Sequence, residues 1–390
     1  MAATGTRNTS NVAGRKYDVA DVVSLLNVDR YPLLGILTNA GKDPVSKKGK
    51  AVKKMETTDP EFKWFEDTFG TRELTTASGN TSKNIASTPS ITVATGTGVY
   101  VQAGDIVHFP GTKYTFRVTA VSTDTLTLSN ELGGATGTVD LSSLALWIVG
   151  NSNQEGAGLR ELKGTTAEEK VGYCQIFRTP FGVTETSRNT TTFIKENDLD
   201  YQRRKAGIEH MVDIERAFFF GKKNKDTSGT HPRRTTAGII NSISTYATAN
   251  VDTEDEFETF LETAMLNGNT EKYAFCGAAF ISQVSVWAKN KLQLLRTDQT
   301  YGVTIYRYES VHGTLNLIKH DLLKGTTYGN YCVVVDMEKL TYRYLKARDT
   351  KLLTDRQNNG DDEKVEEYLS EVGLQFEQES CHAIASKGSL

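Results

Sequence analysis

Residues 197–220 carry both the charge pattern and the apolar pattern of one long α-helix, and they are the longest such segment in the chain. Asn197 favours the N-cap position, and Gly221 with the two lysines after it is typical of a helix end. The apolar stripe of this helix comprises Leu199, Ile208, Met211, Val212, Phe218 and Phe219. Because the stripe leaves a large polar face, the segment predicts a rod that lies along a surface.

The charges of the chain nearly cancel, since 45 basic residues stand against 48 acidic ones. No overall field therefore attracts nucleic acid or an anionic membrane, and any such binding has to be local. Cys174, Cys276, Cys332 and Cys381 are far apart and lack a CxxC pair, which favours a reducing compartment without a disulfide or zinc framework. No segment approaches the roughly 18 apolar residues that a membrane span needs.

Two short apolar pieces lie near the N-terminus, at residues 21–26 and 33–37, and no sequence neighbour can cover them. The lysine-rich stretch at 42–54 predicts a solvated loop, with contact to phosphate or to an acidic partner as the alternative. Phe62 and Trp64 are then expected on one face of a strand and Phe65 on the other, so both faces carry aromatic residues. The arm and this strand are expected to find cover on adjacent copies of the chain.

Residues 88–150 consist of short strands rich in Thr and Gly, in which apolar and polar residues alternate strictly. This pattern of short alternating strands predicts a small antiparallel barrel or sandwich of about 60 residues. A domain of that size is just large enough to fold alone. Residues 222–236, which follow the long helix, predict a loop.

The region 251–345 predicts a compact α/β domain. A capping box at Thr253 and Glu256 begins one helix, and a second helix is expected at about 279–294. Strands are expected at 303–309, 313–320 and 331–338, and the last is so apolar that it has to be central in a mixed sheet. The tail after residue 341 is expected to be mainly extended.

No segment carries a recognisable catalytic motif, and we expect no catalytic residue, cofactor or metal. Residues 355–366 lie one substitution from a calcium-binding EF-hand loop, but no helix precedes them to aim the oxygens, so an acidic surface turn is favoured. Cys381 and His382 are adjacent, and adjacent residues of a strand point to opposite faces. A buried structural cysteine is therefore favoured over a thiolate–imidazole pair.

The order of these parts resembles the major capsid proteins of tailed bacteriophages with the Hong Kong 97 fold, in particular the family whose extended loop carries a β insert. The likeness covers residues 17–386. The segments that carry it are YPLLGIL, FKWFEDTF, AGDIVHF with TFRVTAVSTDTLTLS and WIVGNSNQEG, the helix 197–220, and LLTDRQNNGDDEKVEEYLSEVGLQFEQESCHAIA.

The resemblance implies an α+β fold with an N-terminal arm, an extended loop, a peripheral domain with a long spine helix, an axial α/β domain and a small all-β insertion. The expected division is 1–55 for the arm, 56–87 for the first strand of the extended loop, 88–150 for the inserted barrel or sandwich, 151–186 for the return strand, 187–235 for the peripheral domain with the spine helix, 236–340 for the axial domain and 341–390 for the C-terminal strands of the peripheral domain. The expected assembly contacts are Leu33, Leu34, Phe62, Trp64, Phe65 and Arg72.

The resemblance also implies a function. Copies are expected to assemble, as hexamers and pentamers, into the icosahedral shell that encloses a double-stranded DNA genome. The expected partners are a separate scaffolding protein, because the arm begins almost at once, a portal protein, a decoration protein as a further candidate, and the packaged DNA through weak non-specific contact. No membrane is expected; the protein is expected in the virion capsid, assembled in the cytoplasm of the host bacterium.

Three alternatives stay open at this stage. An encapsulin-like nanocompartment shell would share the fold, and a tail-tube or fibre protein would also be a structural repeat. A hydrolase that depends on Cys381 or Cys276 is the alternative of a different class, although no enzyme activity is expected.

Overall fold

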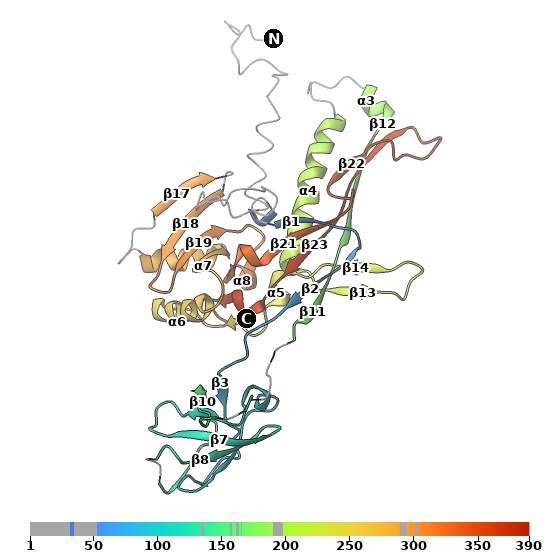
Figure 1. Ribbon diagram of the computed structural model, residues 1–390. Coiled ribbons are helices and arrows are strands. Elements are labelled where there is room, and N and C mark those ends of the chain that lie inside the picture. The colour runs from blue at the N-terminus through green and yellow to red at the C-terminus, as the bar shows by residue number, and fades with distance from the viewer. Residues whose placement is uncertain are drawn as a thin grey trace. The chain divides into compact units, whose positions relative to one another are not determined.

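The computed structural model (Figure 1) describes residues 32–34, 53–133, 136–156, 158–160, 164, 166–189, 198–288, 295–300 and 303–389. The chain forms two compact units: unit 1 comprises residues 1–64 and 169–390, and unit 2 comprises residues 65–168. The apolar piece at 21–26 and almost all of the lysine-rich stretch lie outside the described residues.

Unit 2 is an all-β body around a six-stranded antiparallel sheet in the order β3-β10-β6-β7-β8-β5. Phe116, Val118, Leu126 and Leu128 alternate toward its core and are fully buried, as the sequence predicts. The elements are β3 (Glu73–Thr75), β4 (Lys83–Asn84), β5 (Ser90–Thr92), η1 (Gly98–Tyr100), β6 (Asp105–His108), β7 (Thr115–Ser122), β8 (Thr125–Ser129), β9 (Thr138–Val139) and β10 (Ala145–Asn151).

Unit 2 begins earlier along the chain than the insertion predicted at 88–150. Leu74 of β3 lies opposite Leu146 of β10, and both side chains are buried. β3 is thus part of this compact unit, which extends from Phe65 to Glu168. β3 has three residues and β4 has two, which is too short for an alternation pattern to reveal them.

The first sheet of unit 1 has the order β1-β21-β23-β12, and β22 pairs with β23 at the side. Its strands are β1 (Lys53–Thr57), β12 (Gln175–Thr184), β21 (Leu340–Leu345), β22 (Lys351–Leu353) and β23 (Glu363–Phe376). The short helix α3 (Glu185–Asn189) precedes α4 (Asp198–Phe220), which lies along β12 and β23 (Figure 1). The long helix predicted from the sequence is thereby confirmed.

The buried side of α4 differs in part from the predicted stripe. Leu199, Phe218 and Phe219 are buried as expected, whereas Ile208, Met211 and Val212 are only half-buried. In their place the helix buries two ionisable side chains, His210 and Glu215. A hydrophobicity pattern cannot predict that such residues are buried, because it counts them as polar.

The second sheet of unit 1 is mixed and has the order β15-β24-β20-β16-β19-β18-β17. The predicted capping box is present at Thr253 and Glu256, and β20 is central and buried throughout. The remaining elements are α5 (Ile239–Ser242), β15 (Ala247–Thr248), α6 (Glu254–Met265), β16 (Glu271–Cys276), α7 (Ala278–Ala288), β17 (Leu295–Thr300), β18 (Val303–Glu309), β19 (Thr314–Lys319), α8 (Gly325–Tyr328), β20 (Tyr331–Val335), η2 (Met337–Lys339), η3 (Glu379–Cys381) and β24 (Ala383–Ser386).

Two cores lie on the two faces of this mixed sheet. Val333 and Val335 of β20 belong to the core that α4 shares with the first sheet, whereas Cys332 and Val334 belong to the core under α6 and α7. Alternate residues of one strand thus join both layers of the unit.

The predicted loop at 222–236 is wrong in part, because it contains a hairpin of β13 (Asn224–Asp226) and β14 (Arg233–Thr235). Asp226 accepts hydrogen bonds from the backbone and side chain of Ser228 at 2.9 and 2.6 Å, which fixes the turn. A second two-stranded sheet pairs β2 (Glu61–Glu66) with β11 (Glu168–Tyr173), where the chain passes out of unit 1 and returns to it.

Candidate functional site

The arm is fixed to the long helix through one buried carboxylate. The backbone N–H groups of Leu33 and Leu34 donate to the two oxygens of Glu215 at 2.9 and 2.8 Å. His320 Nε2 lies 2.9 Å from Glu215 Oε1, and His320 Nδ1 accepts from the N–H of Leu322 at 3.1 Å, so Nε2 carries the proton and donates. We call Leu33, Leu34, Glu215 and His320 the arm anchor; all four are buried.

The arm anchor corrects an expectation from the sequence. Leu33 and Leu34 were expected to find cover on adjacent copies, but both pack into the core of their own chain, against residues of α4 and the mixed sheet. Their side chains are therefore not available to a second copy. Glu215 is the functional residue that the sequence analysis missed, although a carboxylate four positions from both Met211 and Phe219 on the apolar stripe was a signal.

Phe62 is also covered within its own chain. Its ring stacks on that of Trp64 at a centroid distance of 6.0 Å, and the Arg343 guanidinium lies 5.7 Å from its centroid. A Cβ at Gly172 of β11 would lie 2.4 Å from the Phe62 ring, so the packing requires glycine there. Phe62 thus holds the β2–β11 sheet together, and the expectation that it is covered by a neighbour is wrong.

Two exposed phenylalanines lie close together in the segment 65–72 of unit 2, which also exposes Trp147 and several aliphatic side chains elsewhere. Phe65 is 70% exposed and Phe69 is fully exposed, and Arg72, the other contact expected here, is exposed too. Single exposed apolar residues are common, but two phenylalanines four residues apart on one segment are not. Sequence reasoning named Phe65 and Arg72 and missed Phe69.

A row of polar contacts holds α4 along the first sheet. Arg203 donates from Nε and Nη2 to the two oxygens of Glu366, both at 2.8 Å. His210 lies between Thr179 Oγ1 at 2.9 Å and Ser370 Oγ at 2.6 Å, and burial lowers its pKa. A bidentate pair and a buried imidazole with two partners fix the rotation of the helix about its axis.

The same ion pair bears on the calcium-like loop. Glu366 would be its twelfth ligand, but it is engaged by Arg203, and Asp355 pairs with Lys364. Among the residues that the structure describes, no group of three His, Cys, Asp or Glu side chains is arranged to hold a metal ion. The segment is an acidic surface turn.

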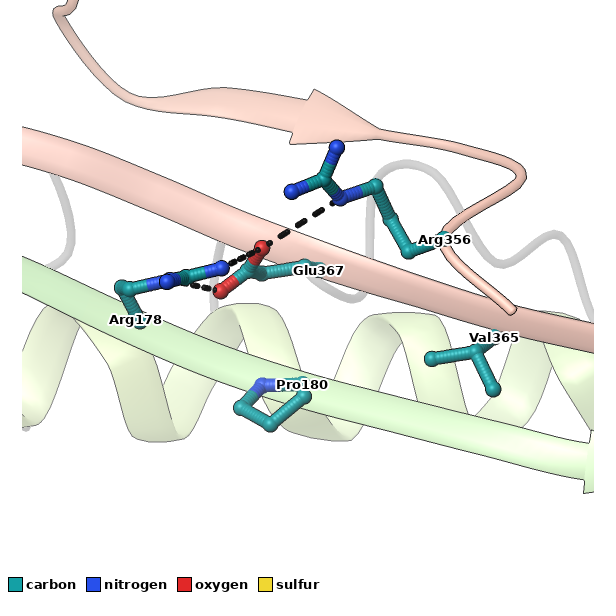
Figure 2. Close-up of a pocket in the computed structure, with 5 residues that line it drawn as sticks. All are labelled: Arg178, Pro180, Arg356, Val365 and Glu367. Atoms are coloured by element: carbon teal, nitrogen blue, oxygen red, sulfur yellow. Dashed lines mark hydrogen bonds and ion pairs between the residues drawn. The ribbon is translucent and has the colours of Figure 1, made fainter. Parts of the chain in front are cut away.

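On the face of β12 and β23 that points away from α4, two guanidinium groups converge on one carboxylate (Figure 2). Arg178 of β12 donates from Nε and Nη2 to the two oxygens of Glu367, the second contact measuring 2.9 Å. This pairing lowers the pKa of Glu367. Arg356, Pro180 and Val365 complete an open pocket of about 290 Å³, which sequence reasoning did not predict.

No thiolate–imidazole pair exists at Cys381 and His382. Both ring nitrogens of His382 meet backbone groups, with Nδ1 3.3 Å from the N–H nitrogen of Asp336 and Nε2 3.2 Å from the carbonyl oxygen of Glu377. Burial raises the pKa of the Cys381 thiol and, well above its usual range, that of Cys276, whose sulfur lies 3.3 Å from that of Cys332. Neither thiol is activated as a nucleophile.

The buried His382 predicts a loss of stability in acid. Burial lowers its pKa from 6.5 to about 4, so between these values the unfolded chain binds a proton that the folded chain does not. The free energy of unfolding should therefore fall as the pH drops from 6.5 to 4, by up to about 3 kcal/mol from this residue. Urea unfolding at pH 7 and 4.5 checks this, and His382→Gln should flatten the dependence. Equal slopes for both proteins would contradict it.

Residues 2–388 match the family model described as "SU10 major capsid protein". The chain belongs to the SU10 major capsid protein family. This family is one of structural capsid proteins, so the hydrolase alternative is wrong, and the resemblance to tailed-phage major capsid proteins is confirmed. The described helices and sheets have the predicted α+β composition.

Relatives of the SU10-family chain include a curated phage protein. This chain is 22% identical over 275 residues to the "Major capsid protein" of Pseudomonas phage PaMx41. The match spans 66% of each chain, just under two thirds. Among solved structures, the encapsulin SrpI of Synechococcus elongatus PCC 7942 gives a TM-score of 0.43 at 9% identity, with 57% of this chain and 76% of that chain covered. The structure from Mycobacterium phage Bobi gives a TM-score of 0.42 at 11% identity, with 60% of this chain and 79% of that chain covered.

The SU10-family assignment selects between the alternatives. A phage capsid protein fits both the family and the curated relative, so it is favoured over the nanocompartment shell. None of the described helices is both long and apolar enough to cross a membrane.

Proposed function

We propose that copies of this SU10-family protein assemble, as hexamers and pentamers, into the closed icosahedral shell that encloses the double-stranded DNA genome of a tailed phage. The observation that carries the proposal is the exposed aromatic segment 65–72, in which Phe65 is 70% exposed and Phe69 is fully exposed. Exposed aromatic residues that a partner can bury dominate the free energy of many interfaces. Repeated over a closed shell, such contacts reinforce one another.

The proposal also assigns a structural role to each part of the subunit. Unit 2, entered and left through the β2–β11 sheet, acts as the extended loop with its insertion, and α4 with the first sheet acts as the peripheral domain. The mixed sheet with α6 and α7 acts as the axial domain. Of the six contacts expected from the sequence, we retain Trp64, Phe65 and Arg72 as candidates, because the other three are buried in their own chain.

Partners and location complete the proposal. A separate scaffolding protein, a portal protein and a decoration protein are the proposed partners, and the host cytoplasm is the proposed place of assembly. Contact with packaged DNA is proposed to be weak and independent of sequence. The β13–β14 hairpin supports this, because two of its three basic side chains are already paired, Lys225 with Glu61 at 2.8 Å and Arg233 with Asp226 at 3.1 Å.

Assembly of the full-length chain tests the proposal. The chain is purified alone and together with the scaffolding protein of its phage, and then examined by sedimentation velocity and electron cryomicroscopy. Closed shells of uniform radius are expected in at least one of the two preparations. A chain that stays monomeric at high concentration in both would contradict the proposed function.

A further inference from the structure

The pocket of Figure 2 holds one more cation than its carboxylate needs. Arg178 alone already makes the bidentate contact with Glu367, whose side chain is 5% exposed. Arg356 adds a second guanidinium, so the group of three carries an excess of one positive charge. A buried carboxylate needs one guanidinium to offset its desolvation. The guanidinium of Arg356 is therefore not needed to stabilise Glu367.

Arg356 is placed in the pocket but is not satisfied there. Its backbone N–H donates to the carbonyl of Val365 at 2.9 Å, which holds the loop in position. Its Nε lies 3.7 Å from Glu367 Oε2, beyond hydrogen-bond distance, and the side chain is 47% exposed. Within the part of the chain that the structure describes, this guanidinium makes no closer polar contact, so its N–H donors can bind a further acceptor.

The surroundings select what can enter. Pro180 and Val365 give the pocket an apolar wall, and its volume of about 290 Å³ admits one side-chain carboxylate rather than a stretch of nucleic acid. The neighbouring turn carries Asp361, Asp362 and Glu363, all exposed. A DNA backbone would meet these acids at the same time as the guanidinium groups, whereas a single carboxylate side chain would not.

We propose that Arg178 and Arg356 form a receptor for one carboxylate side chain of a second copy of this chain. The proposal rests on the proposed assembly and names one contact within it. Charge complementarity supports the occupant: unit 2 contains ten acidic and six basic residues, whereas the rest of the chain contains 38 acidic and 39 basic ones. Each copy thus presents an acidic surplus on one unit and the unsatisfied guanidinium on the other.

The first test measures assembly. Arg356→Gln should raise the lowest subunit concentration that yields particles by at least about tenfold, since a charge-assisted hydrogen bond is lost, while the melting temperature of the subunit stays unchanged. Arg216→Gln is the matched control, because its guanidinium also faces a single carboxylate at 3.9 Å but does not line the pocket of Figure 2. Equal assembly of wild type and Arg356→Gln would overturn the proposal.

The second test identifies the partner. Arg356→Lys keeps the charge and supplies an amine that a carbodiimide couples directly to a carboxylate in contact with it. Particles are assembled from isotopically light and heavy subunits, and coupled peptides are mapped by mass spectrometry. A link between a light and a heavy peptide is expected at position 356. Normal particles with links inside one chain only, or with none, would overturn the receptor and leave the proposed function standing. If the variant particles assemble normally but retain less DNA than wild-type particles, the pocket binds phosphate. That result would also overturn the proposed carboxylate receptor.

Discussion

Glu215→Ala is expected to destabilise the subunit by about 3–5 kcal/mol. The substitution leaves three buried donors without an acceptor: the N–H groups of Leu33 and Leu34 and Nε2 of His320. Each unsatisfied buried donor costs about 1–3 kcal/mol, and the removed side chain leaves a cavity. Urea unfolding of the full-length chain measures the loss. Hydrogen exchange of the peptide that contains Leu33 and Leu34 should accelerate well before global unfolding, because these amides lose their acceptor.

Two further variants separate the arm anchor from a general effect on the helix. Glu209→Ala changes an exposed carboxylate of the same helix, 3.9 Å from Lys205, and should shift the stability by less than about 0.5 kcal/mol. Glu215→Gln keeps one oxygen acceptor but turns an NH₂ group toward a donor, so an intermediate loss is expected. Unchanged stability of Glu215→Ala, with the amides of Leu33 and Leu34 still protected, would show that the carboxylate does not hold the arm.

The parts of the fold that the sequence predicts are those encoded within one element. The helix Asp198–Phe220 and the capping box of Thr253 and Glu256 follow from residues that are near one another in the chain. The central strand Tyr331–Val335 is apolar along its whole length, so it has no face that could meet water. Periodicity and capping are local properties, and no tertiary contact is needed to infer them.

The parts that the sequence does not predict depend on contacts between distant residues. Leu33 and Glu215 are 182 positions apart, and Arg178 and Glu367 are 189 apart. An apolar arm with no sequence neighbour to cover it is compatible with burial against another copy or in its own core. The choice depends on whether acceptors for its backbone N–H groups lie inside the chain. Glu215 supplies them, and only the folded structure brings it to the arm.

Phe65→Ala is expected to weaken assembly strongly while it leaves the subunit folded. The side chain is 70% exposed in the single chain, so its removal should change the free energy of unfolding by less than about 0.5 kcal/mol. An aromatic side chain that becomes buried at an interface contributes about 2–4 kcal/mol there. The lowest subunit concentration that yields particles should therefore rise by roughly 30-fold or more, and sedimentation velocity over a concentration series measures it.

The matched control for Phe65→Ala has to remove an equally exposed apolar side chain elsewhere. Val311→Ala serves, because Val311 is fully exposed and follows β18 in unit 1, outside the segment 65–72. It should assemble like the wild type, whereas Phe69→Ala should resemble Phe65→Ala if the two rings form one contact. Should Phe65→Ala and Phe69→Ala both assemble at the wild-type concentration, the aromatic segment is not an interface, and the contacts between copies have to be sought outside residues 65–72.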